Sequence, residues 1–383
     1  MIKIDSWKGR LVLMTAHCAG MLDLVALPVW VGALISYYGL DPQQAGGLAT
    51  TFLLGTVVSS AIFAPLVLRF QARRMVTIGF ALATVWFLVV TQVSSFGAML
   101  LLHALAGMCS GCGLTFTHGM IGRSKNPHRL FATVGIAIGF FGVLFYALAP
   151  QLLKHLGGSA MFYLFAFVMA VATLMSALGF PSDAQTEQVS TIPTATHARL
   201  DPAVWYVVLG VVCICVVQSM TFSFVERIGI DRGFGFDAVA AVLIALGLVN
   251  LIPAPLAALL QRRLSPHTVL LAGPLLQAML VLVISQSSTF IPYALAASVL
   301  VSIQIFTHTF AFGVLAQLDA TGRAAASTPA TLMIGAAIGP VLGGTLVKSA
   351  GYGSLGFAAM LLALMAITCF RQVRQHPDLV PSV

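Results

Sequence analysis

The stretch PSDAQTEQVSTIPTATHARLDP (residues 181–202) is the longest polar segment of a 383-residue chain, and it predicts how the chain is divided. Proline, serine, threonine and charged residues in such a cluster are typical of a linker. The segments on either side, residues 1–180 and 203–383, are nearly equal in length. Each contains six long apolar runs, so we expect two six-helix domains that arose by duplication, joined by the linker.

The composition excludes several classes of protein. Hydrophobic residues make up 59% of the chain and charged residues 8%, whereas a soluble domain has about 45–50% apolar and about 25% charged residues. Too few polar residues remain to cover a globule in water, which argues against a soluble enzyme or a disordered chain. The net charge of +8 does not indicate nucleic-acid binding, because the basic residues separate apolar runs instead of forming a patch.

The apolar runs predict an all-α membrane protein, since about 20 apolar residues suffice for a helix to span a bilayer. The first run carries Asp23 near its middle and is longer than the apolar core of a signal peptide, so we expect it to remain as a membrane helix. Twelve helices are expected, at residues 11–36, 43–68, 75–94, 96–121, 130–152, 159–180, 203–225, 237–260, 267–288, 291–316, 328–347 and 352–370.

The basic residues predict the orientation of these helices. With the N-terminus in the cytoplasm, 15 of the 19 Lys and Arg residues fall in cytoplasmic segments, and the other four are Lys154, Arg227, Arg232 and Lys348. Because cytoplasmic loops carry an excess of Lys and Arg, both termini and the linker are expected in the cytoplasm. The six cysteines lie in apolar runs and are read as packing residues, including the pair Cys109 and Cys112.

This arrangement resembles the major facilitator superfamily of secondary transporters, and the resemblance covers the whole chain. In that family the loop after helix 2 follows the pattern G-x-L-x-D-R-x-G-R-R; here it reads PLVLRFQARR (residues 65–74). Arg73 and Arg74 match the final arginine pair, while the Gly and Asp positions differ. In helix 4, His103 occupies the position of a frequent family arginine.

Two glycine-rich helices extend the resemblance. Helix 5 contains Gly135 and Gly139, similar to the family's antiporter motif but without its proline, and helix 11 contains Gly335, Gly339 and Pro340, a closer match. The resemblance implies alternating access to a site between the two halves, with no cofactor, and we expect a monomer. Spacing of the GxxxG type permits close helix contacts, which would serve either sliding or static packing.

Other membrane machines would need motifs that the chain lacks. An ATP-driven pump requires a phosphate-binding G-x-x-x-x-G-K-[ST] loop, and a metalloprotease requires H-E-x-x-H; neither occurs in the sequence. We therefore expect neither an enzyme nor a metal site. A channel fits the duplicated architecture less well than a transporter does, and a membrane sensor on the same fold would bind a ligand without moving it.

Asp23 is the acidic residue expected deepest in the membrane. A charge at that depth costs at least about 2.5–3.5 kcal/mol on insertion scales, and such residues usually face a bundle interior or a watery cavity. A carboxyl group there could exchange a proton and switch the transporter, or it could merely hydrogen-bond a neighbouring helix. Helical spacing places Ala16, Gly20, Leu27 and Trp30 on the same stripe, so Trp30 would form an aromatic wall beside it.

Histidines and amides complete the predicted site. His118 and His308 each end the tripeptide Phe-Thr-His in helices 4 and 10, and Gln304 shares a helix face with His308. His308 is expected to bind solute or relay a proton, although a buried structural histidine is an equal alternative for it and the preferred one for His118. His17 lies about 120° around the helix from Asp23 and is not expected beside it.

Helix 7 corresponds to helix 1, and its polar residues Gln218 and Thr221 are expected to line the cavity. Glu226 and Arg227 follow at its end, where a solvated helix terminus is preferred over a gate.

Substrate class follows from the absence of Lys and Arg deep in the spans. An apolar, neutral or cationic solute is favoured over a dianion. The expected function is proton-coupled efflux by antiport across a bacterial inner membrane. The alternative is uptake of a small nutrient or weak acid by proton symport.

Overall fold

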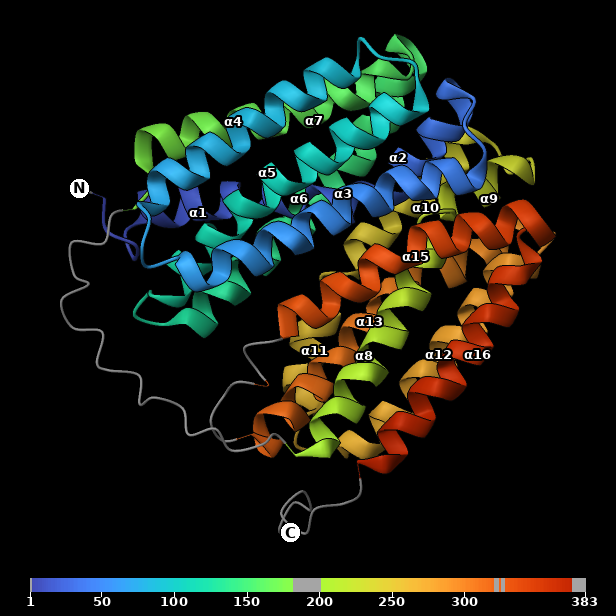
Figure 1. Cartoon of the computed structure of the whole chain (residues 1–383). Coiled ribbons are helices and arrows are strands. Elements are labelled where there is room, and N and C mark those ends of the chain that lie inside the picture. The colour runs from blue at the N-terminus through green and yellow to red at the C-terminus, as the bar shows by residue number, and fades with distance from the viewer. Residues whose placement is uncertain (1, 182–200, 320–323, 325–327, 374–383) are drawn as a thin grey trace. The chain divides into compact units, whose positions relative to one another are not determined.

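The computed structural model describes residues 2–181, 201–319, 324 and 328–373. Most of the predicted linker, together with Arg199, Arg323 and Arg374, lies outside these residues. The described chain is helical, and no strand occurs in it. Contacts divide it into two compact units, Met1–Ser190 and Thr191–Val383, here called unit 1 and unit 2 (Figure 1).

Each unit contributes half of the helices. Those of unit 1 are α1 (Trp7–Gly20), α2 (Leu22–Tyr38), α3 (Pro42–Phe63) with the short η1 (Ala64–Leu66), α4 (Ala72–Val90), α5 (Phe96–Gly122), α6 (Pro127–Leu156) and α7 (Ser159–Gly179). Those of unit 2 are α8 (Pro202–Phe222), α9 (Val225–Asp231), α10 (Phe236–Val249), α11 (Pro253–Leu260), α12 (Pro266–Gln286), α13 (Phe290–Leu318), α15 (Thr328–Ala350) and α16 (Gly353–Gln372).

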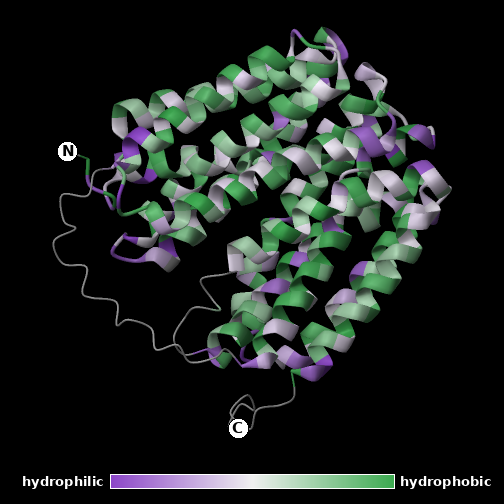
Figure 2. Cartoon of the chain, in the orientation of Figure 1, coloured by the Kyte–Doolittle hydropathy of each residue, from purple (hydrophilic) through white to green (hydrophobic). Residues whose placement is uncertain are grey.

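Twelve stretches of the described chain are long and apolar enough to cross a membrane, which confirms the predicted all-α membrane fold. Hydrophobic residues predominate along the helices, whereas hydrophilic residues gather near the helix ends (Figure 2). On α7, for example, Phe167 and Leu178 are 65% and 72% exposed. Large exposed apolar side chains of this kind suit contact with lipid.

Some predicted helices are interrupted. The run expected as one helix at 11–36 is divided at Met21 into α1 and α2, and the run at 237–260 is divided between α10 and α11. Pro253 explains the second interruption, because a proline has no N–H to donate to the helical ladder and its ring clashes with the carbonyl group four residues earlier. Near the first, Gly20 packs so closely on Leu114 that an added Cβ would lie 2.7 Å from its Cδ1. Glycine is a poor helix former.

Several acidic residues are accounted for as helix caps. The Asp41 carboxylate accepts from the main-chain N–H of Gln44 at 2.9 Å, and the Gln44 side-chain oxygen accepts from the main-chain N–H of Asp41 at 3.1 Å. The two bonds form a capping box at the start of α3. Asp201 accepts from the Ala203 N–H at 2.7 Å at the start of α8. These carboxylates therefore have a local structural role and are not candidates for transport chemistry.

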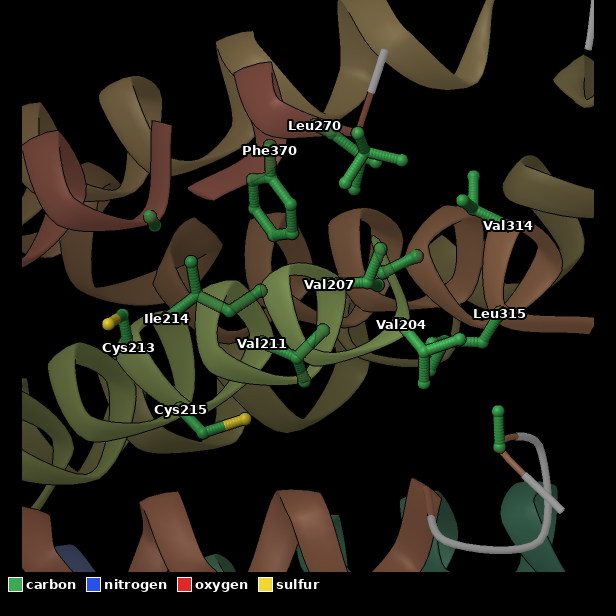
Figure 3. Close-up of a cluster of buried hydrophobic side chains, with 14 residues drawn as sticks. Val204, Val207, Val211, Cys213, Ile214, Cys215, Leu270, Val314, Leu315 and Phe370 are labelled. Carbon is green, nitrogen blue, oxygen red and sulfur yellow. The ribbon is translucent and has the colours of Figure 1, made fainter. Parts of the chain in front are cut away.

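The core of unit 2 is built around α8. Side chains from one side of this helix, including Val207, Val211 and Ile214, pack against Leu270 of α12 and Phe370 of α16 (Figure 3). Each of these five residues is at most 2% exposed. In unit 1 the corresponding close packing involves α3 and α5, where an added Cβ at Gly111 would lie 2.7 Å from the Thr56 Cα.

Candidate functional site

Asp23 lies in the first turn of α2, immediately after the interruption at Met21. It is 2% exposed, and neither carboxylate oxygen has a hydrogen-bond partner among the described residues. Main-chain hydrogen bonds at the junction include those from Met21 N to carbonyl oxygens of α1 and from Val25 N to Met21 O, the latter at 3.4 Å. The interruption therefore places an unsatisfied carboxyl group at the N-terminal end of a half-helix.

The first turn of α2 is hydrogen-bonded to α6. The Tyr146 hydroxyl donates to the Val25 carbonyl oxygen at 2.8 Å, and an added Cβ at Gly142 would lie 3.7 Å from the Val25 side chain. Tyr146 is 4% exposed. Sequence reasoning missed this contact, because nothing in the α6 sequence indicates which of its residues faces the first helix.

Trp30 lies in an aromatic cluster inside unit 1, about two turns beyond Asp23 along α2. Its ring stacks on His103 with centroids 5.5 Å apart and meets the edges of Phe52 and Phe165 at 5.7 and 5.3 Å. Trp30 and His103 are fully buried. The His103 Nδ1 lies 2.6 Å from the Met99 carbonyl oxygen. The predicted aromatic wall is thus enclosed by side chains of α3, α5 and α7.

His118, one of the predicted site residues, is hydrogen-bonded to His17. The distance from His17 Nδ1 to His118 Nε2 is 3.0 Å, and the ring centroids are 5.1 Å apart. Phe131 of α6 presents its edge to His118 at 5.6 Å. The pair joins α1 to α5 across 101 residues of sequence, and the helix periodicity that separated His17 from Asp23 gave no signal of it.

In unit 2, the polar residues of α8 divide into two groups. The Ser219 hydroxyl donates to carbonyl oxygens of its own helix and lies 3.2 Å from the Gly335 carbonyl oxygen of α15. By contrast, Gln218 Oε1 and Thr221 Oγ1 are buried without a partner in the part of the chain that the structure describes. Gln218 and Thr221 are therefore the α8 residues with unused hydrogen-bonding capacity.

Gln304 and His308 of α13 lie in different surroundings despite their helical spacing. The Gln304 amide donates to Cys215 Sγ of α8 at 3.3 Å, and this residue is 8% exposed. His308 packs on Phe312 at 5.0 Å, and its buried Nδ1 has no partner among residues 2–181, 201–319, 324 and 328–373. Gln304 helps to join two helices, whereas His308 retains an unused polar atom.

The two glycine-rich helices differ in packing. On α15, added Cβ atoms at Gly335 and Gly339 would overlap Cys215 and Ser219 of α8, so both glycines permit close contact. Pro340 lies within the same helix. On α6, no described atom lies within 4 Å of a Cβ added at Gly135, and Gly139 is half-buried.

The paired arginines at the start of α4 also differ. Arg73 donates to the Ala177 carbonyl oxygen near the C-terminus of α7, where a cation is favoured by the helix dipole. Arg74 is exposed. Both side chains are exposed, and the contact of Arg73 joins α4 to α7.

The end of the α8–α9 span is a polar cluster, which differs from the solvated terminus expected there. Arg227 forms an ion pair with Asp231 at 2.6 Å, and the Tyr352 hydroxyl donates to Asp231 Oδ2 at 2.6 Å. Burial and the Asp231 carboxylate raise the pKa of the Tyr352 hydroxyl. Glu226 carries a buried Oε2 without a partner in the described chain.

No group of three or more His, Cys, Asp or Glu residues within the described chain is arranged to hold a metal ion. The six cysteines are free thiols, so Cys109 and Cys112 are not joined by a disulfide.

Comparison with known proteins identifies the architecture. The family model described as "Major Facilitator Superfamily" matches residues 12–327. Searching the curated proteins gave no significant match. Among solved structures, the fold is similar to that of a mutant of the nucleoside transporter NupG, at 13% identity and a TM-score of 0.74, with 96% of this chain and 99% of that chain covered.

Two further structures show the same likeness. A D-xylose–proton symporter is 15% identical, with a TM-score of 0.75 and coverage of 96% of this chain and 97% of that chain. A bacterial homologue of the human lysosomal transporter Spinster, in an inward-facing and unoccupied conformation, is 13% identical, with a TM-score of 0.72 and coverage of 97% and 98%. At these identities the likeness establishes the fold.

Proposed function

The chain belongs to the major facilitator superfamily, and on that premise we propose that it is a proton-coupled secondary transporter that exports a small organic solute by antiport. Membership of the family means that the chain is a multi-pass membrane transporter and not an enzyme. Coupling to protons, the direction of transport and the solute class are argued from the residues below.

The proton-coupling proposal rests on Asp23. A buried polar group left without a hydrogen bond costs about 1–3 kcal/mol, and a charged one more. The carboxyl group of Asp23 meets this description, since it is 2% exposed and without a partner in the described chain. In a membrane such a residue is by default a functional candidate. Protonation would remove the buried charge, and a bound solute would supply a partner for it, so proton and solute can compete for one group.

The solute class rests on the charges within the spans. Lys and Arg residues of the described spans lie within five residues of a span end. The buried groups without a partner in the described chain include Trp30 Nε1, His103 Nε2 and Glu226 Oε2, and four that belong to the predicted polar site residues: the Asp23 carboxyl, Gln218 Oε1, Thr221 Oγ1 and His308 Nδ1. We propose these four as the solute contacts. They suit an apolar, neutral or cationic solute, because a buried dianion would need a compensating cation.

Orientation remains the one expected from the basic residues, with both termini in the cytoplasm, and we propose a bacterial inner membrane as the location. A cysteine introduced at Thr194 should resist a membrane-impermeant thiol reagent in intact cells and react after permeabilisation. For a clean result, the cysteine is placed in a background where Cys18, Cys109, Cys112, Cys213, Cys215 and Cys369 are serine or alanine. Labelling in intact cells would reverse the orientation.

Antiport is tested with purified protein in liposomes that enclose a pH-sensitive dye. Solutes from a neutral and cationic panel are added outside at equal pH on both sides. In antiport, solute entry drives protons out and the lumen becomes alkaline; in symport, the lumen becomes acidic. The sign does not depend on how the protein is oriented in the vesicle. The symport outcome is the alternative function, favoured by the fold shared with a D-xylose–proton symporter.

A membrane sensor gives a third result. A solute that raises the thermal stability of the protein but moves no protons and does not accumulate in the liposomes would overturn transport altogether.

A further inference from the structure

The hydrogen-bonded pair of His17 and His118 is a polar element of unit 1 that the proposed coupling at Asp23 does not use. His17 is 7% exposed and His118 is half-buried. Their facing atoms, His17 Nδ1 and His118 Nε2, are 3.0 Å apart, a normal hydrogen-bond length. The two residues lie on different helices, α1 and α5.

This geometry fixes how hydrogens are arranged in the neutral pair. One of the two facing nitrogens must carry a hydrogen and the other must accept it, because a neutral imidazole has one donor and one acceptor nitrogen. Each ring also has an outer nitrogen, Nε2 in His17 and Nδ1 in His118. In the neutral pair one outer nitrogen carries a hydrogen and the other is free to accept one.

A pair of this kind can pass a proton without being broken. When a proton binds the free outer nitrogen of one ring, that ring becomes an imidazolium and its facing N–H bond is strengthened by the charge. The facing hydrogen then moves to the second ring, whose outer nitrogen releases its own hydrogen. One proton enters, one leaves and the total charge is conserved. Only the tautomers of the two rings have been exchanged, and rotation of the rings or passage in the reverse direction restores them.

His17 lies on the same membrane span as Asp23, residues Trp7–Tyr38. Six residues separate His17 from Asp23, which corresponds to about 9 Å along a helix, a gap that ordered water can bridge. The main-chain ladder is interrupted at Met21, between the two residues, and carbonyl oxygens at a helix end can accept from such water. His17 is on the N-terminal side of Asp23, which is the cytoplasmic side in the proposed orientation.

The charged groups on the surrounding elements are engaged near the helix ends. Asp5 lies 3.9 Å from Arg10 and accepts from the Lys125 N–H, and the Arg123 side chain donates to the Gly119 carbonyl oxygen. On α6, Arg129 is exposed and Phe131 is the residue against His118. No Asp, Glu, Lys or Arg occurs on α7, and Asp23 is the charged residue of α2. Asp23 is thus the ionisable group within the membrane interior toward which the pair can transfer protons.

We propose that His17 and His118 form a proton relay between Asp23 and the cytoplasm. The relay rests on the proposed proton coupling, and it adds residues outside the solute contacts. It also reassigns His118, since the facing nitrogen of this residue is occupied by His17.

The experiment compares two kinds of transport by the full-length protein in liposomes. Net flux driven by a pH gradient requires proton release on each side, whereas solute counterflow at equal pH exchanges labelled for unlabelled solute without net proton movement. The probe is the panel solute that gives the largest pH change with the wild-type protein. For His17→Gln and His118→Gln we expect net flux to fall at least about a hundredfold, the lower end of the range for a proton-transferring group, with counterflow unchanged.

His103→Gln is the matched control, because His103 is also a buried histidine of α5 but bonds its own helix at Met99. It should leave the ratio of net flux to counterflow at the wild-type value. A further variant, His118→Ala, removes the ring, and added imidazole should restore its net flux. Restoration by imidazole is not expected if the pair only joins α1 to α5.

The outcomes separate this relay from the coupling it serves. A wild-type flux that does not change with the pH gradient would contradict the proposed coupling. Wild-type flux that follows the gradient, together with an unchanged net flux to counterflow ratio in both glutamine variants, would overturn the relay alone. If the glutamine variants do not fold, as judged by thermal unfolding, the imidazole response of His118→Ala decides, and absence of restoration overturns the relay.

Discussion

The first membrane span of each unit occupies the same position in the order of helices, yet the two are built differently. In unit 1 the span is interrupted near its middle at Met21, and the polar group beside the interruption is Asp23, a carboxyl without a partner in the described chain. In unit 2 the first span, Pro202–Asp231, is interrupted later, between α8 and α9, so α8 runs unbroken from Pro202 to Phe222. The polar residues of α8 are amides and hydroxyls, and Ser219 already contacts α15. Glu226, whose buried Oε2 has no partner in the described chain, lies beyond the break, in α9.

The difference indicates a division of labour between the units. A group that binds a proton within the bilayer must tolerate both a charged and a neutral state, and the ends of interrupted helices provide main-chain dipoles for this. Amides and hydroxyls keep one charge state and suit recognition of a neutral or cationic solute. We therefore expect unit 1 to determine coupling, and unit 2 to determine solute affinity and the rigidity of its own bundle.

The largest expected effect follows replacement of Asp23. Asp23→Asn keeps the shape of the side chain but cannot titrate, so flux driven by a pH gradient should fall to the level of empty liposomes. The matched change in unit 2, Gln218→Asn, should weaken solute binding while the flux still follows the gradient. Both are measured in liposomes with an imposed gradient. Undiminished gradient-driven flux in Asp23→Asn would remove the basis of the comparison.

The glycine-rich helices offer a second contrast, in stability. An alanine at Gly339 would place its Cβ against Ser219 and 2.5 Å from Met220 N, and such overpacking costs about 1–3 kcal/mol. An alanine at Gly135 meets open space and should stabilise α6 by up to about 1 kcal/mol, because glycine is the poorer helix former. The unfolding temperature, measured in detergent, should therefore fall for Gly339→Ala and rise for Gly135→Ala. A lower unfolding temperature for Gly135→Ala would mean that α6 needs this glycine for a contact of its own.

Much of the fold could be predicted because it depends on hydropathy alone. Apolar runs of sufficient length set the number of spans, and the twelve described spans agree with the runs read from the sequence. The interruption at Met21 was not predicted. It depends on tertiary contacts such as that between Gly20 and Leu114, which connect helices far apart in sequence.

The candidate site was less accessible to sequence reasoning. The position of Asp23 could be predicted, because a single acid in an apolar run has few alternatives to burial. The pairing of His17 with His118 could not, since a straight-helix projection assigns faces within one helix but gives no contacts between helices. The same limit applies to Gln304: spacing placed it beside His308, whereas its amide contacts Cys215 of α8.

The pH dependence of solute binding provides a third test, of which unit carries the titrating group. If an organic cation and a proton compete for the Asp23 carboxyl, cation affinity should rise with pH, by up to tenfold per pH unit while the carboxyl remains protonated. The slope should disappear in Asp23→Asn and persist in His308→Ala. Dianions should bind poorly at pH 7.5. Affinity is measured by titration in detergent for a cation that stabilises the protein. Tight dianion binding that persists in His308→Ala would reveal a cation absent from the proposed contacts.

The smallest expected effect separates two neighbouring residues of α8. Ser219→Ala removes a hydrogen bond to α15 and should lower stability by roughly 0.6 kcal/mol, the average for polar contacts between membrane helices, with solute affinity unchanged. Thr221→Val keeps the shape of a side chain whose hydroxyl has no partner in the described chain. The substitution should leave stability unchanged. It should weaken the binding of a solute that hydrogen-bonds the hydroxyl by about 0.5–1.5 kcal/mol. Unfolding temperature and binding titration are measured on both variants. The reverse pattern would mean that Ser219 contacts the solute and that Thr221 stabilises the packing of the helices.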